Sequence, residues 1–511
     1  MAGGILLVAA YGAQNAYMNG NPSMTFFRKV YKTYSHYSME SFTIPMEGPR
    51  QLSLQNKIKL RAKIPRNADL LGYTYMRFTL PSIWSPVECL SGNTVVSPYE
   101  FQWVNNIGHV IIDDVELTLG GQRLVNFGGD YMTMNMETEI TLDKRDLYYR
   151  MIGNVPELTA PANGEYSGGI TGLGSYPNAV SGTGSAPSIY GRDIIVPLPF
   201  WYCNNPGLFL PLGALRYHEI EVTVTLRRIL DLYTVLDAPN KIGDTRPQRI
   251  KPTADPAYNI SKFLSPPGST TFVTSETETW NLNPVIECTQ VFLTDEERRL
   301  FSAENHEYLM KQVSRFNLPG ITSSVRFNMN QHNLVTRILF GLRRSDLLNR
   351  NQWSNFTLWD EEMPPKIEEE VLLCGGQSVP NSGGAIANSR PDILQFARLL
   401  FNGDQIFSDK DPYYFSMIQP WQHSSIGPRR GIYLYSFAFN HNTYQPSGSL
   451  NASMVKLIEL NLIPVAPDTV TVTTVTGSIE MFAYDYEMDI YTESYNFLKI
   501  QGGMGGLKYA L

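Results

Sequence analysis

The stretch Val115-Glu-Leu-Thr-Leu-Gly-Gly-Gln-Arg-Leu-Val125 places apolar residues at alternate positions on both sides of a Gly-Gly pair. Alternation with a period of two is typical of a half-buried β-strand. Gly120 and Gly121 can supply the positive φ angles that a two-residue hairpin turn requires. The stretch therefore predicts a β-hairpin.

A second hairpin of the same kind is predicted 282 residues further along the chain. The stretch Ala397-Arg-Leu-Leu-Phe-Asn-Gly-Asp-Gln-Ile-Phe407 alternates in the same way around Asn402 and Gly403. A tyrosine follows each hairpin at a matching distance, at Tyr131 and at Tyr413. The two hairpins indicate an internal repeat.

Two further correspondences follow in the same order. A turn-rich segment and a strand recur at an offset of 235 residues, as Asn205–Gly213 with Ile220–Leu226 and as Asn440–Gly448 with Val455–Leu460. At an offset of 198 residues, Val291–Glu297 corresponds to Asp489–Tyr495. Each of these two segments places a threonine before an acidic residue, which predicts a helix start at Thr294 and at Thr492.

The offset between corresponding segments falls from 282 to 235 to 198 residues along the chain, which indicates that the first copy carries longer loops. It holds 47 extra residues before Gly213 and 37 more after it. We assign these insertions to residues 153–188, which are rich in Gly and Ser, and to residues 237–269, which are rich in Pro. Both stretches lack apolar periodicity and are typical of surface loops. The sequence therefore predicts an all-β chain of two tandem sandwiches.

The composition agrees with this prediction and excludes several classes of protein. The 29 Tyr and 24 Phe favour strands, while the 40 Gly and 33 Pro favour turns. The four cysteines form no CxxC pair, so we expect free thiols at Cys89, Cys203, Cys288 and Cys374. No apolar run approaches the roughly 18 residues of a membrane span, and Ile5–Ala10 is too short for a signal peptide.

Charge is distributed unevenly along the chain. The net charge is −7, but residues 1–70 carry nine Lys/Arg against three Asp/Glu, which leaves −13 for the remainder. The N-terminal part could therefore face an anionic partner. Within it, residues 20–34 combine aromatic rings with Arg28, Lys29 and Lys32 and contain no acid.

Two interpretations of residues 20–34 remain open. Ser23 is a suitable cap for a short amphipathic helix whose rings would pack on the first sandwich, with solvated cations. Alternatively, the three cations contact an anionic membrane or another protein. A neighbouring strand places Lys57, Lys59, Arg61 and Lys63 on one face. This face is either simply solvated, or it deters edge pairing with another strand, or it extends the basic surface. Direct binding of nucleic acid is disfavoured, because the rings lie at helical spacing.

The motifs of common catalytic and metal sites are missing from the sequence. The seven histidines include no His-x-His pair: His36, His109, His218, His306, His332, His423 and His441. Neither Asp113-Asp114 nor Glu219 with Glu221 has the arrangement of a glycosidase pair. There is no GxSxG or GxxxxGK[ST] motif. We read residues 502–506 as a flexible terminal turn. No enzyme, metal or cofactor is expected.

The N-terminal stretch MAGGILLVAAYGAQNAYMNGNPSMTFFRKVYKTYSHYSMES closely resembles the N-terminus of major capsid proteins of nucleocytoplasmic large DNA viruses. Further segments match that family in order: Ile64–Leu70, Val115–Arg123, Leu215–Ile220, His306–Leu309, Gly431–Phe437 and Gly502–Ala510. The resemblance runs from end to end and weakens only in the two long loops.

The resemblance implies an all-β chain of two eight-stranded jelly rolls. The expected divisions are an N-terminal arm (1–24), a first jelly roll (25–293), a connecting helix (294–304), a second jelly roll (305–500) and a C-terminal tail (501–511). Homotrimers would tile an icosahedral shell. Residues 153–188 and 237–269 are candidates for towers on its outside, and Arg28, Lys29 and Lys32 for contacts on its inside.

The resemblance implies as partners other trimers, minor capsid and penton proteins and a nearby inner viral membrane, without sequence-specific binding of nucleic acid. The protein would belong to the virion and assemble in the infected host cell, in its cytoplasm. Because lectins and cupins also use jelly rolls, an oligomeric carbohydrate-binding protein or a glycan-processing enzyme is the alternative.

Overall fold

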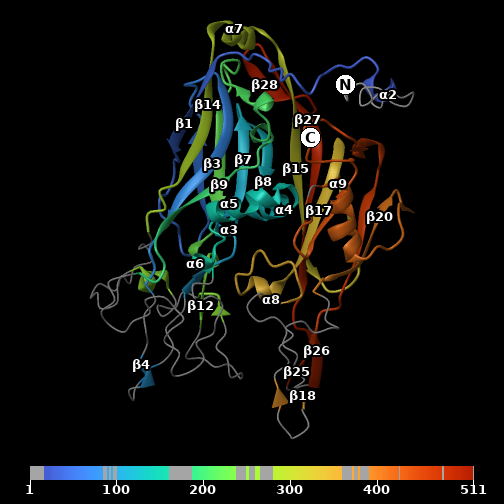
Figure 1. The fold of residues 1–511 in the computed structure, drawn as a ribbon. Helices are drawn as coiled ribbons and strands as arrows, with labels where there is room; N and C mark the ends of the chain where they lie inside the picture. Colours follow the sequence, from blue (N-terminus) through green and yellow to red (C-terminus); the bar gives the residue numbers. More distant parts are fainter. Residues whose placement is uncertain are drawn as a thin grey trace, which may run out of the picture.

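The computed structural model describes residues 16–84, 89–90, 94–95, 101–159, 187–236, 249–252, 259–264, 280–359, 371–372, 378–379, 391–424, 426–474 and 477–509. The chain is built mainly from antiparallel β-sheets with a few short helices, as Figure 1 shows. No helix in the described part of the chain is long and apolar enough to cross a membrane. The all-β prediction is thus confirmed.

The first half of the chain contributes two four-membered sets of paired strands. One set runs in the order β1 (Tyr37–Pro45), β14 (Val285–Leu293), β3 (Leu70–Leu80) and β9 (Arg192–Pro197), and β10 (Leu210–Pro211) also pairs with β3. The other runs in the order β2 (Ile58–Lys63), β11 (Ile220–Leu226), β7 (Ile112–Leu119) and β8 (Gln122–Phe127).

The second half repeats this order. One set comprises β15 (His306–Ile321), β27 (Tyr486–Gln501), β17 (Leu334–Arg344) and β22 (Ile432–Ser436), with β23 (Leu450–Asn451) added to β17 and β28 (Met504–Leu507) to β27. The other comprises β16 (Val325–Asn328), β24 (Ile458–Pro464), β20 (Leu394–Phe401) and β21 (Asp404–Gln405). In each half the last long strand lies between the first and the third, which is the arrangement of a jelly roll.

Side-chain alternation explains why these segments form sandwiches. In β11, Ile220, Val222, Val224 and Leu226 are buried while the residues between them are half-buried. The buried faces of the first half form one core, which extends to second-half residues such as Leu339, Tyr491 and Leu498. Other buried residues of the second half form a separate core that begins at Ile321. Successive residues of a strand point to opposite faces, so this pattern fixes which face of each sheet is inside.

Both hairpins predicted from the repeat are confirmed. β7 and β8 pair across Gly120 (φ 56°) and Gly121 (φ 84°). β20 and β21 pair across Asn402 (φ 52°) and Gly403 (φ 91°). These four positive φ angles are the reason that the turns require Gly or Asn.

Short helices occupy the ends of the sandwiches and the space between them. They are α2 (Ala16–Asn19), α3 (Ile107–Val110), α4 (Gly129–Glu139), α5 (Leu142–Ile152), α6 (Pro156–Thr159), α7 (Asp295–Ala303), α8 (Ser345–Leu348) and α9 (Gln419–His423), with the π-helical turn η6 (Tyr414–Ile418) before α9. In Figure 1, α7 lies at the top of the molecule and α4 lies beside the strands of the second sandwich.

The opposite end of the molecule carries smaller strands. These are β6 (Phe101–Trp103), β12 (Tyr233–Leu236) and β13 (Arg249–Ile250), the pairs β4–β5 (89–90, 94–95) and β18–β19 (371–372, 378–379), and the hairpin β25 (Thr469–Thr474) with β26 (Gly477–Phe482). Most of the predicted insertions, namely residues 160–186, 237–248, 253–258 and 265–269, lie outside the described residues.

The predicted helix at Thr492 is wrong. Thr294 does precede α7, but Thr492 lies within β27 and is buried. β27 forms ladders with β15 on one side and β17 on the other. A helix would lose both sets of backbone hydrogen bonds, so the tertiary pairing overrides the local signal.

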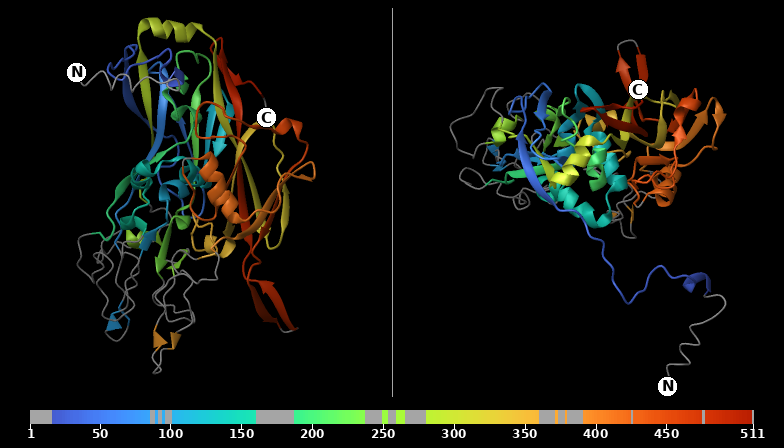
Figure 2. Two further views of the ribbon diagram at one scale, coloured as in Figure 1. Left: turned by 45° about the vertical axis from the view of Figure 1, so that its right-hand side comes forward. Right: turned by 90° about the horizontal axis from the view of Figure 1, so that it is seen from above.

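The predicted helix at Ser23 is wrong as well. After α2 the chain is extended apart from a turn near residue 26, and residues 17–41 are exposed. Figure 2 shows this segment leaving the body of the molecule. A helix of this length is marginal without a surface to pack on, and the rings of this segment are exposed.

The turn at residues 502–506 is packed against the first sandwich rather than loose. The Tyr217 amide donates a hydrogen bond to the Gly503 carbonyl oxygen (3.0 Å). His218 Nδ1 lies 2.9 Å from the Gly505 carbonyl oxygen. The β27–β28 hairpin of the second sandwich is therefore attached to the first.

Candidate functional site

The helix α4 is the element that joins the two sandwiches. It follows β8 directly, and Gly129 lies so close to the preceding helix that an added Cβ would be 2.0 Å from the His109 carbonyl oxygen. Residues 129–138 are all buried although many are polar. A helix that is buried all round must find partners for its polar groups, and α4 finds them on the second sandwich.

The first group of partners, here called the Asp130 cluster, comprises Asp130, Arg227, Arg315, Arg343 and Asp489. Arg343 of β17 donates to Asp130 at 3.1 Å and also pairs with Asp489 of β27. Arg315 of β15 donates to Asp489 at 3.1 Å. Arg227 Nη2 lies 3.4 Å from Asp130. Two carboxylates and three guanidinium groups thus form one ionic network that spans both sandwiches.

The second group, here called the Glu493 cluster, comprises Glu493, Arg337, Glu139 and Lys311 together with polar residues of α4. Arg337 of β17 is completely buried and pairs with Glu493 and with Glu139, the latter at 2.9 Å. It also donates to Asn135 Oδ1 at 2.6 Å. The Tyr131 hydroxyl donates to Glu493 at 2.7 Å.

The electrostatics of both clusters favour the charged carboxylates. Burial alone raises the pKa of the Asp130 carboxyl, but Arg343, Arg227 and Arg315 lower it to about 2. Burial likewise raises the pKa of the Glu493 carboxyl, and Arg337 with Lys311 lowers it to about 2. Neither group can act as a general acid or base near neutral pH, so the clusters are suited to holding the sandwiches together.

Sequence reasoning missed both clusters. The one local signal is the composition of α4, GDYMTMNMETE, in which no face is apolar throughout. Such a helix is either exposed or buried among polar partners. The arginines that contact α4 are brought there by strand pairing between residues more than a hundred positions apart in the sequence.

The predicted contact residues Arg28, Lys29 and Lys32 all lie on the exposed N-terminal segment. None of them forms a hydrogen bond or ion pair with another described residue, and the neighbouring rings are exposed, with Phe27 99% exposed. The structure therefore removes the interpretation in which these rings pack on the first sandwich of the same chain. The segment without regular strand pairing continues past residue 24, and the first long strand, β1, begins at Tyr37.

The predicted basic strand exists, but its charge is largely neutralised. In β2, Ile58, Leu60 and Ala62 are buried and the cations alternate with them. Arg61 pairs with Glu221, Lys63 lies 3.2 Å from Glu219, and Lys57 lies 2.8 Å from Asp113. Asp113, Glu219 and Glu221, which were considered as glycosidase carboxylates, thus serve as ion-pair partners. Because they neutralise most of its cations, the strand is a poor surface for nucleic acid.

His109, Cys203 and Cys288 behave as structural residues, whereas Cys374 lies outside the described residues. His109 is buried between Thr133 (3.1 Å) and Tyr148 (2.9 Å), and burial lowers its pKa to about 3. Cys203 and Cys288 are free thiols, and burial raises the pKa of Cys203 to about 12. Among the described residues, no three His, Cys, Asp or Glu side chains are arranged to hold a metal ion.

Comparison with protein families gives two matches that together span most of the chain. Residues 25–260 match the family described as the major capsid protein N-terminus. Residues 297–506 match the family described as the large eukaryotic DNA virus major capsid protein. The boundary between the matches falls near α7, where the first sandwich ends and the second begins.

Curated relatives match over their whole length. The chain is 27% identical to the major capsid protein of Phaeocystis pouchetii virus, with 100% of each chain covered. It is also 27% identical to the major capsid protein of Paramecium bursaria Chlorella virus 1, again with 100% of each chain covered.

Solved structures show the same fold. The VP54 protein of PBCV-1 superposes with a TM-score of 0.64 at 21% identity, covering 95% of this chain and 100% of that one. The Faustovirus major capsid protein superposes with a TM-score of 0.64 at 13% identity, covering 98% and 99%. At these identities the similarity establishes the double jelly-roll fold.

Proposed function

Because the chain belongs to the family of large eukaryotic DNA virus major capsid proteins, we propose that three copies form a trimer of pseudo-hexagonal outline and that such trimers tile an icosahedral shell. The observation that carries the proposal is the repeated sheet order of the two sandwiches. Each chain contributes two similar sandwiches, so a three-fold axis places six similar sandwiches around a closed ring.

The buried clusters support the role of the chain as a rigid building block. An inter-trimer lattice requires each chain to present both sandwiches at a fixed angle. The Asp130 and Glu493 clusters tie α4 to β15, β17 and β27, and the β28 hairpin adds a second attachment. Burial of apolar surface between copies would drive trimer formation, and more polar contacts would join the trimers.

The proposed division of the chain keeps the predicted boundaries. The first jelly roll would span residues 25–293, the connecting helix 294–304 and the second jelly roll 305–500, with the arm and the C-terminal tail outside them. In support, the long strands from β1 to β14 pair among themselves, as do those from β15 to β28. α7 lies between the two sets along the chain.

The proposed orientation places the N-terminal arm on the inner side of the shell. In support, Figure 1 shows α7 and α2 toward one end, with β4, β18 and β26 at the other. Residues 153–188 and 237–269 would then form outward towers. Arg28, Lys29 and Lys32 would face minor capsid proteins or an inner membrane. The proposal also includes a place for the protein in the virion. Assembly with penton proteins would occur in the host cytoplasm, and the chain would have no catalytic role.

Electron-microscope class averages of the purified full chain test the oligomeric state. We expect a three-fold particle with a hexagonal outline, since the two sandwiches of each chain are similar in plan. Monomers, or rings of another symmetry, would contradict the trimer while leaving the fold of each chain unaffected.

Replacing Arg28, Lys29 and Lys32 together by alanine tests the arm. We expect trimers of unchanged size and thermal midpoint, because these side chains contact no other described residue. Shell formation and lipid content should fall, because the inner contact loses three cations. The matched control replaces Lys59 and Lys144, which are also exposed, by alanine. Particles of normal yield and lipid content from the triple variant would rule out the inner-face role.

A further inference from the structure

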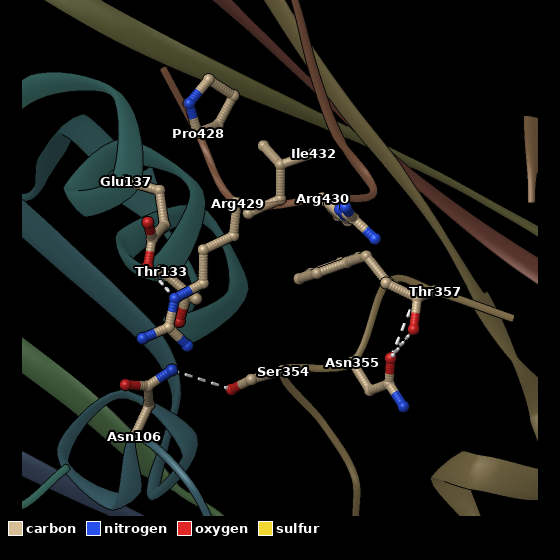
Figure 3. Close-up of a pocket in the computed structure, with 11 residues that line it drawn as sticks. Asn106, Thr133, Glu137, Ser354, Asn355, Thr357, Pro428, Arg429, Arg430 and Ile432 are labelled. Atoms are coloured by element: carbon tan, nitrogen blue, oxygen red, sulfur yellow. Dashed lines mark hydrogen bonds and ion pairs between the residues drawn. The ribbon is translucent and has the colours of Figure 1, made fainter. Parts of the chain in front are cut away.

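The seam between the two sandwiches contains a cavity of about 500 Å³ beside α4. Asn106, Thr133 and Glu137 line it from the first sandwich. The segments 354–357 and 428–432 line it from the second. Figure 3 shows Arg429 reaching toward Glu137 and Thr133 on one wall, with Ser354, Asn355 and Thr357 along the other. A molecule bound here would touch both sandwiches at once.

The walls of this cavity carry an excess of positive charge. Arg429 Nε lies 3.2 Å from Glu137 Oε1, and its Nη2 donates to the Tyr149 hydroxyl at 2.9 Å. Arg145 lies 3.5 Å from the other oxygen of Glu137. Glu137 is the single carboxylate among the lining residues and is therefore shared by two guanidinium groups.

Arg430 adds a guanidinium group without a carboxylate partner among the described residues. Its contact there is the ring of Trp359, with the guanidinium carbon 5.9 Å from the ring centroid. A guanidinium group has five N–H donors in a planar fork, which suits a carboxylate or phosphate group. The cavity thus offers more donors than its own acceptors can use.

The remaining polar groups of the cavity are fixed in place. The Asn106 amide donates to Ser354 Oγ at 3.2 Å, which leaves the Ser354 hydroxyl hydrogen free to donate to another acceptor. The Asn355 side chain is held by Trp359 O (2.7 Å) and by the Thr357 amide (3.0 Å). The cavity wall is therefore organised before any ligand arrives.

Gly431 holds the two segments of the second sandwich together. Its φ is +84°, and an added Cβ would lie 2.0 Å from the Phe356 carbonyl oxygen. Only glycine permits this approach, which fixes the residues on either side of it, Arg430 and Ile432. Phe356, Pro428 and Ile432 add apolar surface to the cavity.

We propose that this seam cavity binds a small organic oxyanion, a molecule of metabolite size that carries a carboxylate or phosphate group. The anionic group lies against Arg430, and the carbon skeleton lies against Pro428 and Ile432. The volume falls within the range of about 300–1,000 Å³ that is typical of small-molecule sites. Because the ligand contacts both sandwiches, its binding stabilises the seam.

Thermal unfolding of the full chain tests this proposal, with 3-phosphoglycerate as the probe because it carries both a phosphate and a carboxylate. Glycerol is the uncharged control with the same carbon skeleton, and sodium chloride at equal ionic strength controls for screening. We expect 3-phosphoglycerate alone to raise the thermal midpoint by a few degrees in a saturable manner. Titration calorimetry then gives the stoichiometry, expected to be one per chain.

Two variants locate the site. Arg430→Gln should abolish the shift in thermal midpoint and leave the ligand-free midpoint unchanged, because Arg430 contacts only a ring among the described residues. Arg326→Gln, an exposed arginine of β16 on the other sheet, should keep the full shift. No shift in the unmodified chain, an equal shift with glycerol, or an undiminished shift in Arg430→Gln would each overturn the proposal.

Discussion

Replacing Arg337 by methionine is expected to lower the free energy of unfolding by about 3–5 kcal/mol, the usual cost of removing one partner from a buried ionic network. Arg337 is completely buried and pairs with Glu493 and Glu139. Methionine has a similar length but no donors, so Glu493 loses its nearest cation. The Asn135 side chain loses a hydrogen bond of 2.6 Å as well.

The cost should come from the uncompensated buried charge of Glu493 rather than from lost volume. Adding Glu493→Gln to Arg337→Met should therefore recover part of the loss, since the double variant no longer buries an uncompensated carboxylate. Differential scanning calorimetry of the single and double variants measures the difference. Arg150→Met, which removes the ion pair with Asp146 on the surface of α5, is the control and should cost about 1 kcal/mol or less. A cost for Arg337→Met as small as that of the control would contradict the role assigned to the Glu493 cluster.

The second large effect is expected from acid. The pKa values of Asp130 and Glu493 are lowered to about 2 in the folded chain, below the ordinary values of 3.8 and 4.5. The unfolded chain therefore takes up protons first as the pH falls. The stabilisation from these carboxylates is fully present above about pH 5 and is lost as the pH falls from about 4.5 to 2.

The measurement is the thermal midpoint between pH 7 and pH 2 for the unmodified chain and for Asp130→Asn with Glu493→Gln. The variant should start lower and decline less steeply below pH 4.5. His109 and His441, whose pKa values burial lowers to about 3 and about 2, add a loss below about pH 6.5 in both proteins. The difference between the two curves of thermal midpoint against pH thus reports the contribution of the Asp130 and Glu493 carboxylates alone. Parallel curves below pH 4.5 would show that the clusters do not respond to acid.

The parts of the fold that could be predicted from the sequence depend on local chemistry. Gly120-Gly121 and Asn402-Gly403 require positive φ angles wherever they occur in a hairpin, so the turns were predictable from four residues. The alternation in residues 57–64 similarly predicted the exposed and buried faces of β2. The order of these signals along the chain was sufficient to indicate two sandwiches of one plan.

The parts that could not be predicted depend on partners far away in the sequence. Thr294 and Thr492 carry the same local signal, yet one precedes a helix and the other lies in a strand, because β27 has a strand on each side. Arg337 and Glu493 each look like ordinary surface residues, and only the position of α4 buries them. The rings near Ser23 looked like a packed face, but no residue in the described part of the chain covers them.

The contact between the β28 hairpin and the first sandwich sets an order of events during synthesis. His218 meets the carbonyl oxygen of Gly505, a residue 287 positions later. The ribosome must therefore make almost the whole second sandwich before the first acquires this attachment. A nascent chain that stops before residue 505 therefore lacks this attachment between its two sandwiches.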